Sequence, residues 1–195
     1  MEHLRLFPTN IFRFKNAYSN VNEIKNIILK ERTDNPTWQS DNKLHLRPNF
    51  KYFVDMILQN NKMVLDTLQY GYKGFKINDM WANILEPGQS HPVHTHANNF
   101  LSGVFYVYAE KTSGIVFLDP KKQSSVIKPM KLKDTYDNSD RHLEMSNTNT
   151  MFIFPSWLEH FVPPNNSDKI RISISWNIQL FGEVGASSDF QSAVF

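Results

Sequence analysis

Residues 94–108 read HTHANNFLSGVFYVY, and this stretch decides how the rest of the chain is interpreted. Its second part, from Asn98 to Tyr108, is rich in aromatic and branched residues, which is typical of a β-strand. Its first part places His94 and His96 two positions apart. Because side chains two positions apart on an extended segment share one face, both imidazoles should point to the same place. The stretch therefore predicts a strand that opens on two ligands of a metal ion.

A third ligand and an anion-binding group follow later in the chain. Residues 155–160 read PSWLEH and supply His160, and Arg171 comes after them. Three protein ligands on one face leave the other positions of the metal open, as mononuclear non-haem iron enzymes require. The guanidinium of Arg171 can hold a carboxylate in a bidentate grip. We therefore predict that His94, His96 and His160 bind iron and that Arg171 binds an anionic cosubstrate.

Four further polar residues are candidates for the cosubstrate pocket. Ser173 lies two residues after Arg171, so its hydroxyl should share that face of the strand and add a hydrogen bond. The other three lie in predicted strands, where residues of these types serve packing and pairing as often as they line a pocket. They are Tyr106, Asn83 and Ser102.

Composition predicts one domain without thiol chemistry. The chain has 195 residues, 41% of them hydrophobic, which is enough for one domain with a substantial core. A net charge of +2 without long charged blocks gives no electrostatic case for nucleic acid or an anionic membrane as a partner. Cysteine is absent, so any metal ligands are imidazole or oxygen groups. No apolar stretch has the length of a signal peptide or a membrane span, and we expect a cytoplasmic protein.

The hydrophobic pattern changes from mixed to mostly strand along the chain. In the first part we expect helices over 23–31, capped by Asn22, and from Phe50 to Leu58 with an extension towards Leu68. Short strands are expected over 4–7, 10–14, 75–85, 98–108, 114–118, 125–128, 150–154, 161–162 and 169–180. The fold class is thus mostly β with N-terminal helices, in a sandwich or jelly roll. We expect a support region over 1–74, a β core over 75–180, and a loop inserted over 130–149 within one domain over 1–195.

The ordered set of motifs resembles the 2-oxoglutarate- and iron(II)-dependent oxygenases over roughly residues 75 to 180. The residues that carry the resemblance are His94-x-His96, Leu101-Ser102-Gly103-Val104-Phe105-Tyr106-Val107, Gly114-x-x-Phe117-x-x-Pro120, Lys128-Pro129, Phe152-x-Phe154-Pro155, His160-x-Val162-x-Pro164, Arg171 and Ser175-Trp176-Asn177. The branch that it resembles most is bacterial and phage, with prolyl 4-hydroxylases more distant.

The resemblance implies a cupin-like double-stranded β-helix that uses Fe(II), 2-oxoglutarate and O2 and forms succinate and CO2. The expected reaction is hydroxylation of an organic substrate, either a peptide or protein side chain or a small metabolite. We expect a monomer or a homodimer.

One position departs from the pattern of that family. Most of its members have His-x-Asp or His-x-Glu, whereas here the carboxylate position holds His96. A neutral third ligand leaves the iron site with one more unit of positive charge. This favours a cupin-like three-histidine dioxygenase or isomerase that does not use 2-oxoglutarate. The sequence is also compatible with two histidines completed by water, with His91 in place of His94, and with a jelly-roll binding module without catalysis.

Overall fold

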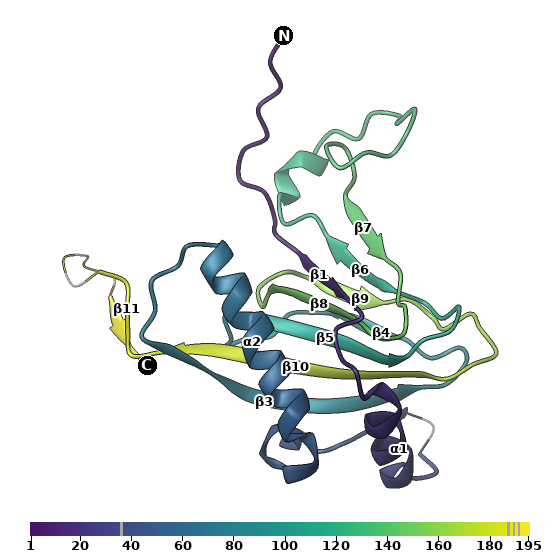
Figure 1. Ribbon diagram of the computed structural model, residues 1–195. Helices are drawn as coiled ribbons and strands as arrows, with labels where there is room; N and C mark the ends of the chain where they lie inside the picture. Colours follow the sequence, from purple (N-terminus) through teal and green to yellow (C-terminus); the bar gives the residue numbers. More distant parts are fainter. Residues whose placement is uncertain (36, 187, 189, 191) are drawn as a thin grey trace.

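The computed structural model describes residues 1–195 except 36, 187, 189 and 191, and its centre is a pair of antiparallel sheets. The larger sheet has the strand order β1 (Phe12–Lys15), β8 (Thr150–Pro155), β5 (Leu101–Tyr108), β10 (Arg171–Phe181), β3 (Gly74–Leu85) and β2 (Thr37–Gln39). The smaller sheet has the order β4 (His91–His94), β9 (His160–Val162), β6 (Ile115–Leu118) and β7 (Arg141–Glu144). The two helices lie against the larger sheet (Figure 1).

The strands from β3 to β10 form a double-stranded β-helix. The chain passes from the larger sheet to the smaller one and back, with β3, β5, β8 and β10 in the larger sheet and β4, β6, β7 and β9 in the smaller. This topology confirms the expected fold class. Strands β11 (Glu183–Val184) and β12 (Ala193–Val194) pair with each other in a separate antiparallel sheet near the C-terminus.

The helices cover one face of the larger sheet because each carries an apolar stripe. Helix α1 spans Val21–Glu31 and buries Ile24 and Ile28, and helix α2 spans Lys51–Thr67. Helix α2 is continuous through Asn61, whose side-chain amide donates to the carbonyl of Ile57 at 2.9 Å. Among the described residues, short 3-10 helices occur at Leu44–Leu46, Pro48–Phe50 and Lys122–Ser125.

The predicted helix cap was wrong by two residues. Helix α1 begins after Asn20, whose backbone carbonyl accepts hydrogen bonds from Glu23 at 3.1 Å and from Ile24 at 3.4 Å. Asn22 therefore lies inside the first turn, where its side chain is not at the capping position.

Strand β5 separates the two layers of the core. Leu101, Phe105 and Val107 point to the helix layer, whereas Val104 and Tyr106 belong to the apolar cluster between the sheets. Gly103 lies directly against the ring of Trp176, because a Cβ atom at residue 103 would be 2.2 Å from that ring. This close approach requires glycine at that position in the core.

Two predicted strands are absent from the structure. Residues 4–7 form no strand, and the segment 125–128 contains the end of a 3-10 helix and a bend. Both belong to parts of the chain that extend beyond the sheets (Figure 1), where no neighbouring strand offers backbone partners. The two parts are joined to each other by Arg5, which donates twice to Asp137 at 3.1 Å. The predicted insert over 130–149 contains β7, which pairs with β6.

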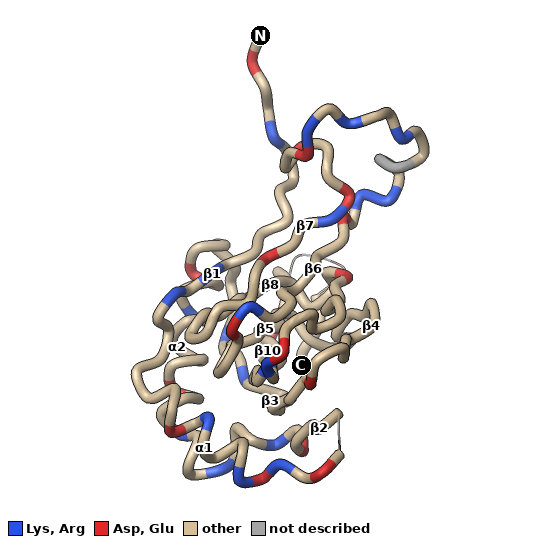
Figure 2. The backbone as a smooth tube through the Cα atoms, turned by 90° about the vertical axis from the view of Figure 1, so that its right-hand side faces the viewer, with Lys and Arg blue, Asp and Glu red and all other residues tan. Residues whose placement is uncertain are grey.

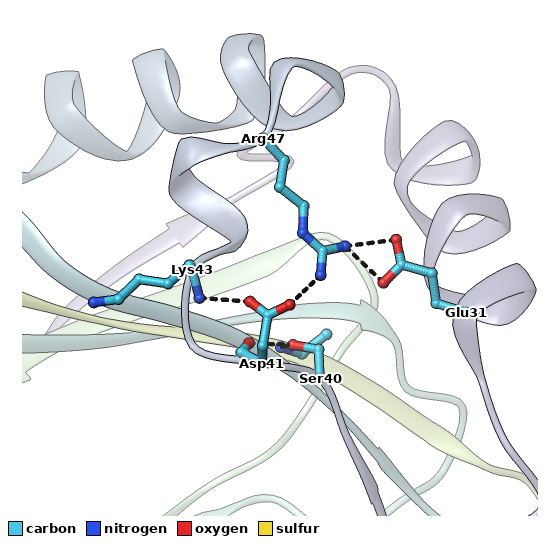
Figure 3. Close-up of polar contacts among 6 residues, drawn as sticks. Glu31, Ser40, Asp41, Lys43 and Arg47 are labelled. Atoms are coloured by element: carbon cyan, nitrogen blue, oxygen red, sulfur yellow. Dashed lines mark hydrogen bonds and ion pairs between the residues drawn. The ribbon is translucent and has the colours of Figure 1, made fainter.

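The edge strand β2 is held in place by a polar network that reaches helix α1 (Figure 3). Arg47 donates to both carboxylate oxygens of Glu31 at 2.7 Å and also to Asp41. The backbone N–H of Lys43 and then Arg47 hold the pKa of the Asp41 carboxyl below its usual value. Ser40 accepts a hydrogen bond from the backbone N–H of Ala82 in β3 at 2.9 Å. The network thus fixes the last residue of β2, Gln39, beside β3.

Charges of both signs occur along most of the chain. Figure 2 shows Lys and Arg interspersed with Asp and Glu, except in the loop between β6 and β7, which carries mainly lysine from Lys121 to Lys133. None of the helices in the described part of the chain is long and apolar enough to cross a membrane.

Candidate metal centre and cosubstrate cavity

Three histidines come together where the smaller sheet faces the cavity. His94 is the last residue of β4 and is paired with His160, the first residue of β9. The centre of the His96 ring is 5.0 Å from that of His94 and 5.2 Å from that of His160. One ring nitrogen from each residue can be chosen so that all three lie within 4.8 Å of one another. This spacing fits a single metal ion bound by three imidazoles.

His96 reaches this cluster from a loop, not from the strand. Strand β4 ends at His94, so the prediction that one strand carries both residues was wrong. The backbone N–H of His96 donates to the carbonyl of Ser156 at 2.9 Å, which keeps the chain alongside the segment before His160. The backbone of His96 is therefore held beside this segment without belonging to the ladder.

Backbone carbonyls fix the orientation of two of the rings. Nδ1 of His94 is 2.8 Å from the carbonyl of Pro92, and Nδ1 of His160 is 2.8 Å from the carbonyl of Leu158. Because a carbonyl only accepts hydrogen bonds, each Nδ1 carries the proton and Nε2 keeps the lone pair that binds metal. Burial lowers the pKa of His160 and of His96 to about 4, so both are neutral at physiological pH.

A cavity of about 210 Å³ extends from the histidines between the two sheets. Its floor is a row of residues that face one another across four strands of the larger sheet. The row consists of Gln39, Asn83, Ser173 and Tyr106, all of which line the cavity. A second row contains Trp81, Ser175 and Val104. The ring of Trp81 is 6.0 Å from that of His96, centre to centre.

Arg171 is the cationic end of the cavity. It is 2% exposed, and its Nη1 donates to the carbonyls of Ser113 at 3.3 Å and Gly114 at 3.4 Å. Its guanidinium carbon is 5.4 Å from the centre of the Tyr106 ring. In the described part of the chain no carboxylate forms an ion pair with it. Burial lowers the pKa of the guanidinium, but arginine stays protonated in proteins.

Unpaired polar atoms surround this buried charge. Nε of Arg171, the hydroxyl of Tyr106 and the hydroxyl of Ser113 are all buried without a hydrogen-bond partner in the described residues. A buried charge without a counterion is costly, and so is each unsatisfied polar atom. A carboxylate beside Arg171 would compensate for both, so the residues present fit an anionic cosubstrate as well as a metal.

Of the other predicted residues, three line the cavity and Ser102 does not. Ser173 and Asn83 line the cavity next to Tyr106. Ser102 is not among the described residues that line it. Its hydroxyl is instead 2.8 Å from the hydroxyl of Ser156 and 2.8 Å from Oδ1 of Asn177, in a buried network under the loop of His96. The prediction of a pocket role for Ser102 is therefore not supported by its position.

Among the residues of the cavity wall, Trp81 and Gln39 were not named as candidates from the sequence, and His91 was named only as an alternative to His94. Trp81 lies two residues before Asn83 and therefore on the same face of β3. The alternation of side chains along this strand could have identified it as a cavity residue. Gln39 comes from a strand of three residues that local sequence does not indicate. His91 also lines the cavity, although it lies three positions before His94.

The sequence between residues 79 and 177 matches the family described as "Putative 2OG-Fe(II) oxygenase". The match covers just over half of the chain and contains the three histidines and Arg171. The chain therefore belongs to the 2OG-Fe(II) oxygenase family, whose members are enzymes that use iron and 2-oxoglutarate. Membership favours this class over a cupin-like enzyme without 2-oxoglutarate and over a binding module. A comparison with curated protein sequences gives no match.

Solved structures with the same fold include prolyl hydroxylases. A prolyl-4-hydroxylase from Pseudomonas putida is 13% identical, with a TM-score of 0.59 and coverage of 89% of each chain. The viral collagen prolyl hydroxylase from Paramecium Bursaria Chlorella virus-1, in complex with 2OG, is 12% identical, with a TM-score of 0.57 and coverage of 86% of this chain and 94% of its own. HygX from Streptomyces hygroscopicus, with nickel and 2-oxoglutarate bound, is 7% identical, with a TM-score of 0.61 and coverage of 96% of this chain and 91% of its own. At these identities the likeness shows the fold alone.

Proposed function

We propose that this enzyme hydroxylates a side chain of a peptide or protein, with His94, His96 and His160 as ligands of Fe(II). Arg171, Ser173 and Tyr106 would hold the distal carboxylate of 2-oxoglutarate, with Asn83 next to Ser173 on the cavity floor. The observation that carries this proposal is Arg171, a buried cation without an acidic partner in the described chain, which lines the same cavity as the three histidines. Bound iron would supply the redox chemistry that converts 2-oxoglutarate and O2 to succinate and CO2 as the substrate is hydroxylated.

The chain's own residues prepare this reaction in three ways. The carbonyls of Pro92 and Leu158 keep Nε2 of His94 and His160 free for the metal. Arg171 and Tyr106 fix the far end of the cosubstrate, which sets its direction along the cavity. The apolar side chains of Phe154 and Val162 line the wall and exclude water from that side.

His96 changes the charge of the site relative to a carboxylate ligand. Three neutral imidazoles leave a divalent ion with its full charge, and the cosubstrate dianion would then be the main compensating group. The carboxylate of Asp79 also acts on His96, because its negative charge opposes the lowering of the His96 pKa by burial. We propose that His96 is a true ligand in place of the usual carboxylate.

The size of the cavity supports a side chain as the reacting group. Pockets for small ligands usually measure about 300–1,000 Å³, and this cavity measures about 210 Å³. Once 2-oxoglutarate occupies it, only a group of side-chain size fits beside the metal. The bulk of the substrate would then remain outside, as it would for one residue of a peptide. A cytoplasmic enzyme is part of the same proposal.

The proposal is tested by adding 2-oxoglutarate to the iron-loaded protein without oxygen. Bidentate chelation should produce a weak visible charge-transfer band, and admission of O2 should then produce succinate. Absence of both the band and succinate would contradict the proposal. Capped peptides that contain proline, asparagine or lysine should raise succinate formation above the rate without substrate. Stimulation by free amino acids alone would contradict the peptide assignment.

A further inference from the structure

An irregular pairing between β4 and β9 brings a fourth histidine into the cavity. His91 is paired with Val162, and His94 is paired with His160, with a shift of register between the two pairs. The partners on β9 are two residues apart and share a face, whereas His91 and His94 are three residues apart. In a regular strand a spacing of three would put the two histidines on opposite faces. The extra residue on β4 is a β-bulge that turns both of them to the cavity, which both line.

Pro92 suits this bulge and serves the metal centre as well. Proline has no N–H for the ladder, and β4 is the edge strand of the smaller sheet, where proline is tolerated. The carbonyl of Pro92 accepts the hydrogen bond from Nδ1 of His94 at 2.8 Å. The segment from His91 to His94 therefore orients a metal ligand and presents a second imidazole to the same cavity.

The ring of His91 lacks a hydrogen-bond partner in the described part of the chain. This distinguishes it from His94 and His160, whose Nδ1 atoms bond to carbonyls. His91 is also not in the group of three whose nitrogens can meet at one metal. Its burial, and then the charges of Arg171 and His94, lower its pKa to about 4. The ring thus lies within the electrostatic reach of both ends of the cavity and carries a free N–H at neutral pH.

We propose that the ring N–H of His91 donates a hydrogen bond to the distal carboxylate of 2-oxoglutarate, beside Arg171. The inference rests on the proposed direction of the cosubstrate, with its 2-oxo acid end at the three histidines and its distal carboxylate at Arg171. His91 is then a positioning residue for the cosubstrate. A neutral donor there adds a contact without a second cation next to the buried guanidinium.

The experiment compares two ligands in the iron-loaded, full-length protein without oxygen. One ligand is 2-oxoglutarate, and the other is 2-oxopentanoate, which has the same chain length and no distal carboxylate. The variants are His91→Leu, which removes the donor, and His91→Gln, which keeps one. His3→Leu, in the exposed N-terminal segment, is the matched control. Dissociation constants are read from the charge-transfer band, iron affinity from a separate titration, and folding from thermal melting.

We expect His91→Leu to weaken 2-oxoglutarate about tenfold, since hydrogen bonds to charged groups are the stronger ones. Its effect on 2-oxopentanoate and on iron should be small, and His91→Gln should retain most of the affinity for 2-oxoglutarate. Equal losses for both ligands would overturn the proposal in favour of a wall residue. A loss of iron affinity would overturn it, because it would indicate that His91 itself binds the metal. Unchanged affinity for 2-oxoglutarate would also overturn it.

Two additions keep these outcomes separate. If His91→Leu does not fold, His91→Phe keeps the size of the ring without the donor and has the same expected result. Arg171→Ala is measured with the same two ligands. If Arg171→Ala does not distinguish them, the proposed direction of the cosubstrate is wrong. If Arg171→Ala weakens 2-oxoglutarate more than 2-oxopentanoate but the His91 variants weaken neither selectively, the proposed direction of the cosubstrate stands and only the proposed role of His91 is wrong.

Discussion

His94 and His160 face each other in register on β4 and β9, with ring centres 4.3 Å apart. Each ring is held by a carbonyl two residues earlier in its own chain segment, Pro92 for one and Leu158 for the other. The two ligands are thus oriented by local backbone contacts before any metal binds. Such preorganisation lowers the cost of forming the centre, because little side-chain freedom remains to be lost.

Replacement of His160 by alanine should remove most of the bound iron. Two remaining imidazoles chelate weakly, so we expect the affinity for Fe(II) to fall by at least about 100-fold while the fold persists. Iron content after gel filtration and melting temperature are the measurements, with His142→Ala, outside the cluster, as control. Iron at the wild-type stoichiometry in His160→Ala would exclude His160 as a ligand.

Replacement of His96 by aspartate tests the unusual ligand. If this position corresponds to the usual carboxylate, His96→Asp should bind Fe(II) as tightly as the wild type or more tightly, because it restores the set of two histidines and one carboxylate that non-haem Fe(II) oxygenases use. His96→Ala is the matched variant without a ligand atom. If both variants lose iron to the same extent, the geometry of the site is specific for three histidines.

Replacement of Arg171 by alanine should weaken 2-oxoglutarate without displacing the metal. Loss of a charge-assisted contact in a buried pocket costs about 2–5 kcal/mol, which corresponds to about 30-fold or more in affinity. Arg171→Lys should recover part of this, since it keeps the charge and loses the planar fork. Titration of the charge-transfer band gives the affinities, and Arg141→Ala, on the exposed strand β7, is the control. Equal affinities in all four proteins would refute the assignment.

The metal-free protein should become less stable as the pH falls from about 6.5 to about 4. Burial lowers the pKa of His91, His96 and His160 to about 4 in the folded chain, against about 6.5 when unfolded. Between these values the unfolded chain binds more protons, so the free energy of unfolding decreases with falling pH. Melting temperatures of the protein treated with chelator, at pH 7.5 and pH 5, should differ in that direction. A smaller difference is expected in His160→Gln, and a rise in melting temperature at pH 5 would contradict the argument.

Most of the fold could be predicted because its main elements carry strong local patterns. The apolar spacing of α2 and the long apolar strands β3, β5 and β10 are visible in the sequence and agree with the structure. The strands predicted over 4–7 and 125–128 had the composition of strands but no neighbour to pair with. Local propensity does not determine pairing, which depends on the rest of the fold.

The candidate site was predictable where residues sit on regular strands and less so elsewhere. Arg171 and Ser173 face the cavity as their spacing indicates. Ser102 lies on a strand that lines the cavity, but its hydroxyl contacts Ser156 instead of lining the cavity itself. The orientation of His91 depends on a bulge that only the pairing with β9 reveals.

The short strand β2 has a consequence for how enzymes of this kind can diversify. The residues matched by the family, 79–177, include the candidate iron ligands and Arg171, whereas Gln39 comes from outside that region. Its strand is held by a side-chain network with Arg47 at its centre and by pairing with β3 (Figure 3). A residue of the cavity floor and the candidate iron ligands are therefore encoded in separate stretches of the gene. A substitution of Gln39 alters the cavity floor and leaves the candidate iron ligands and Arg171 unchanged.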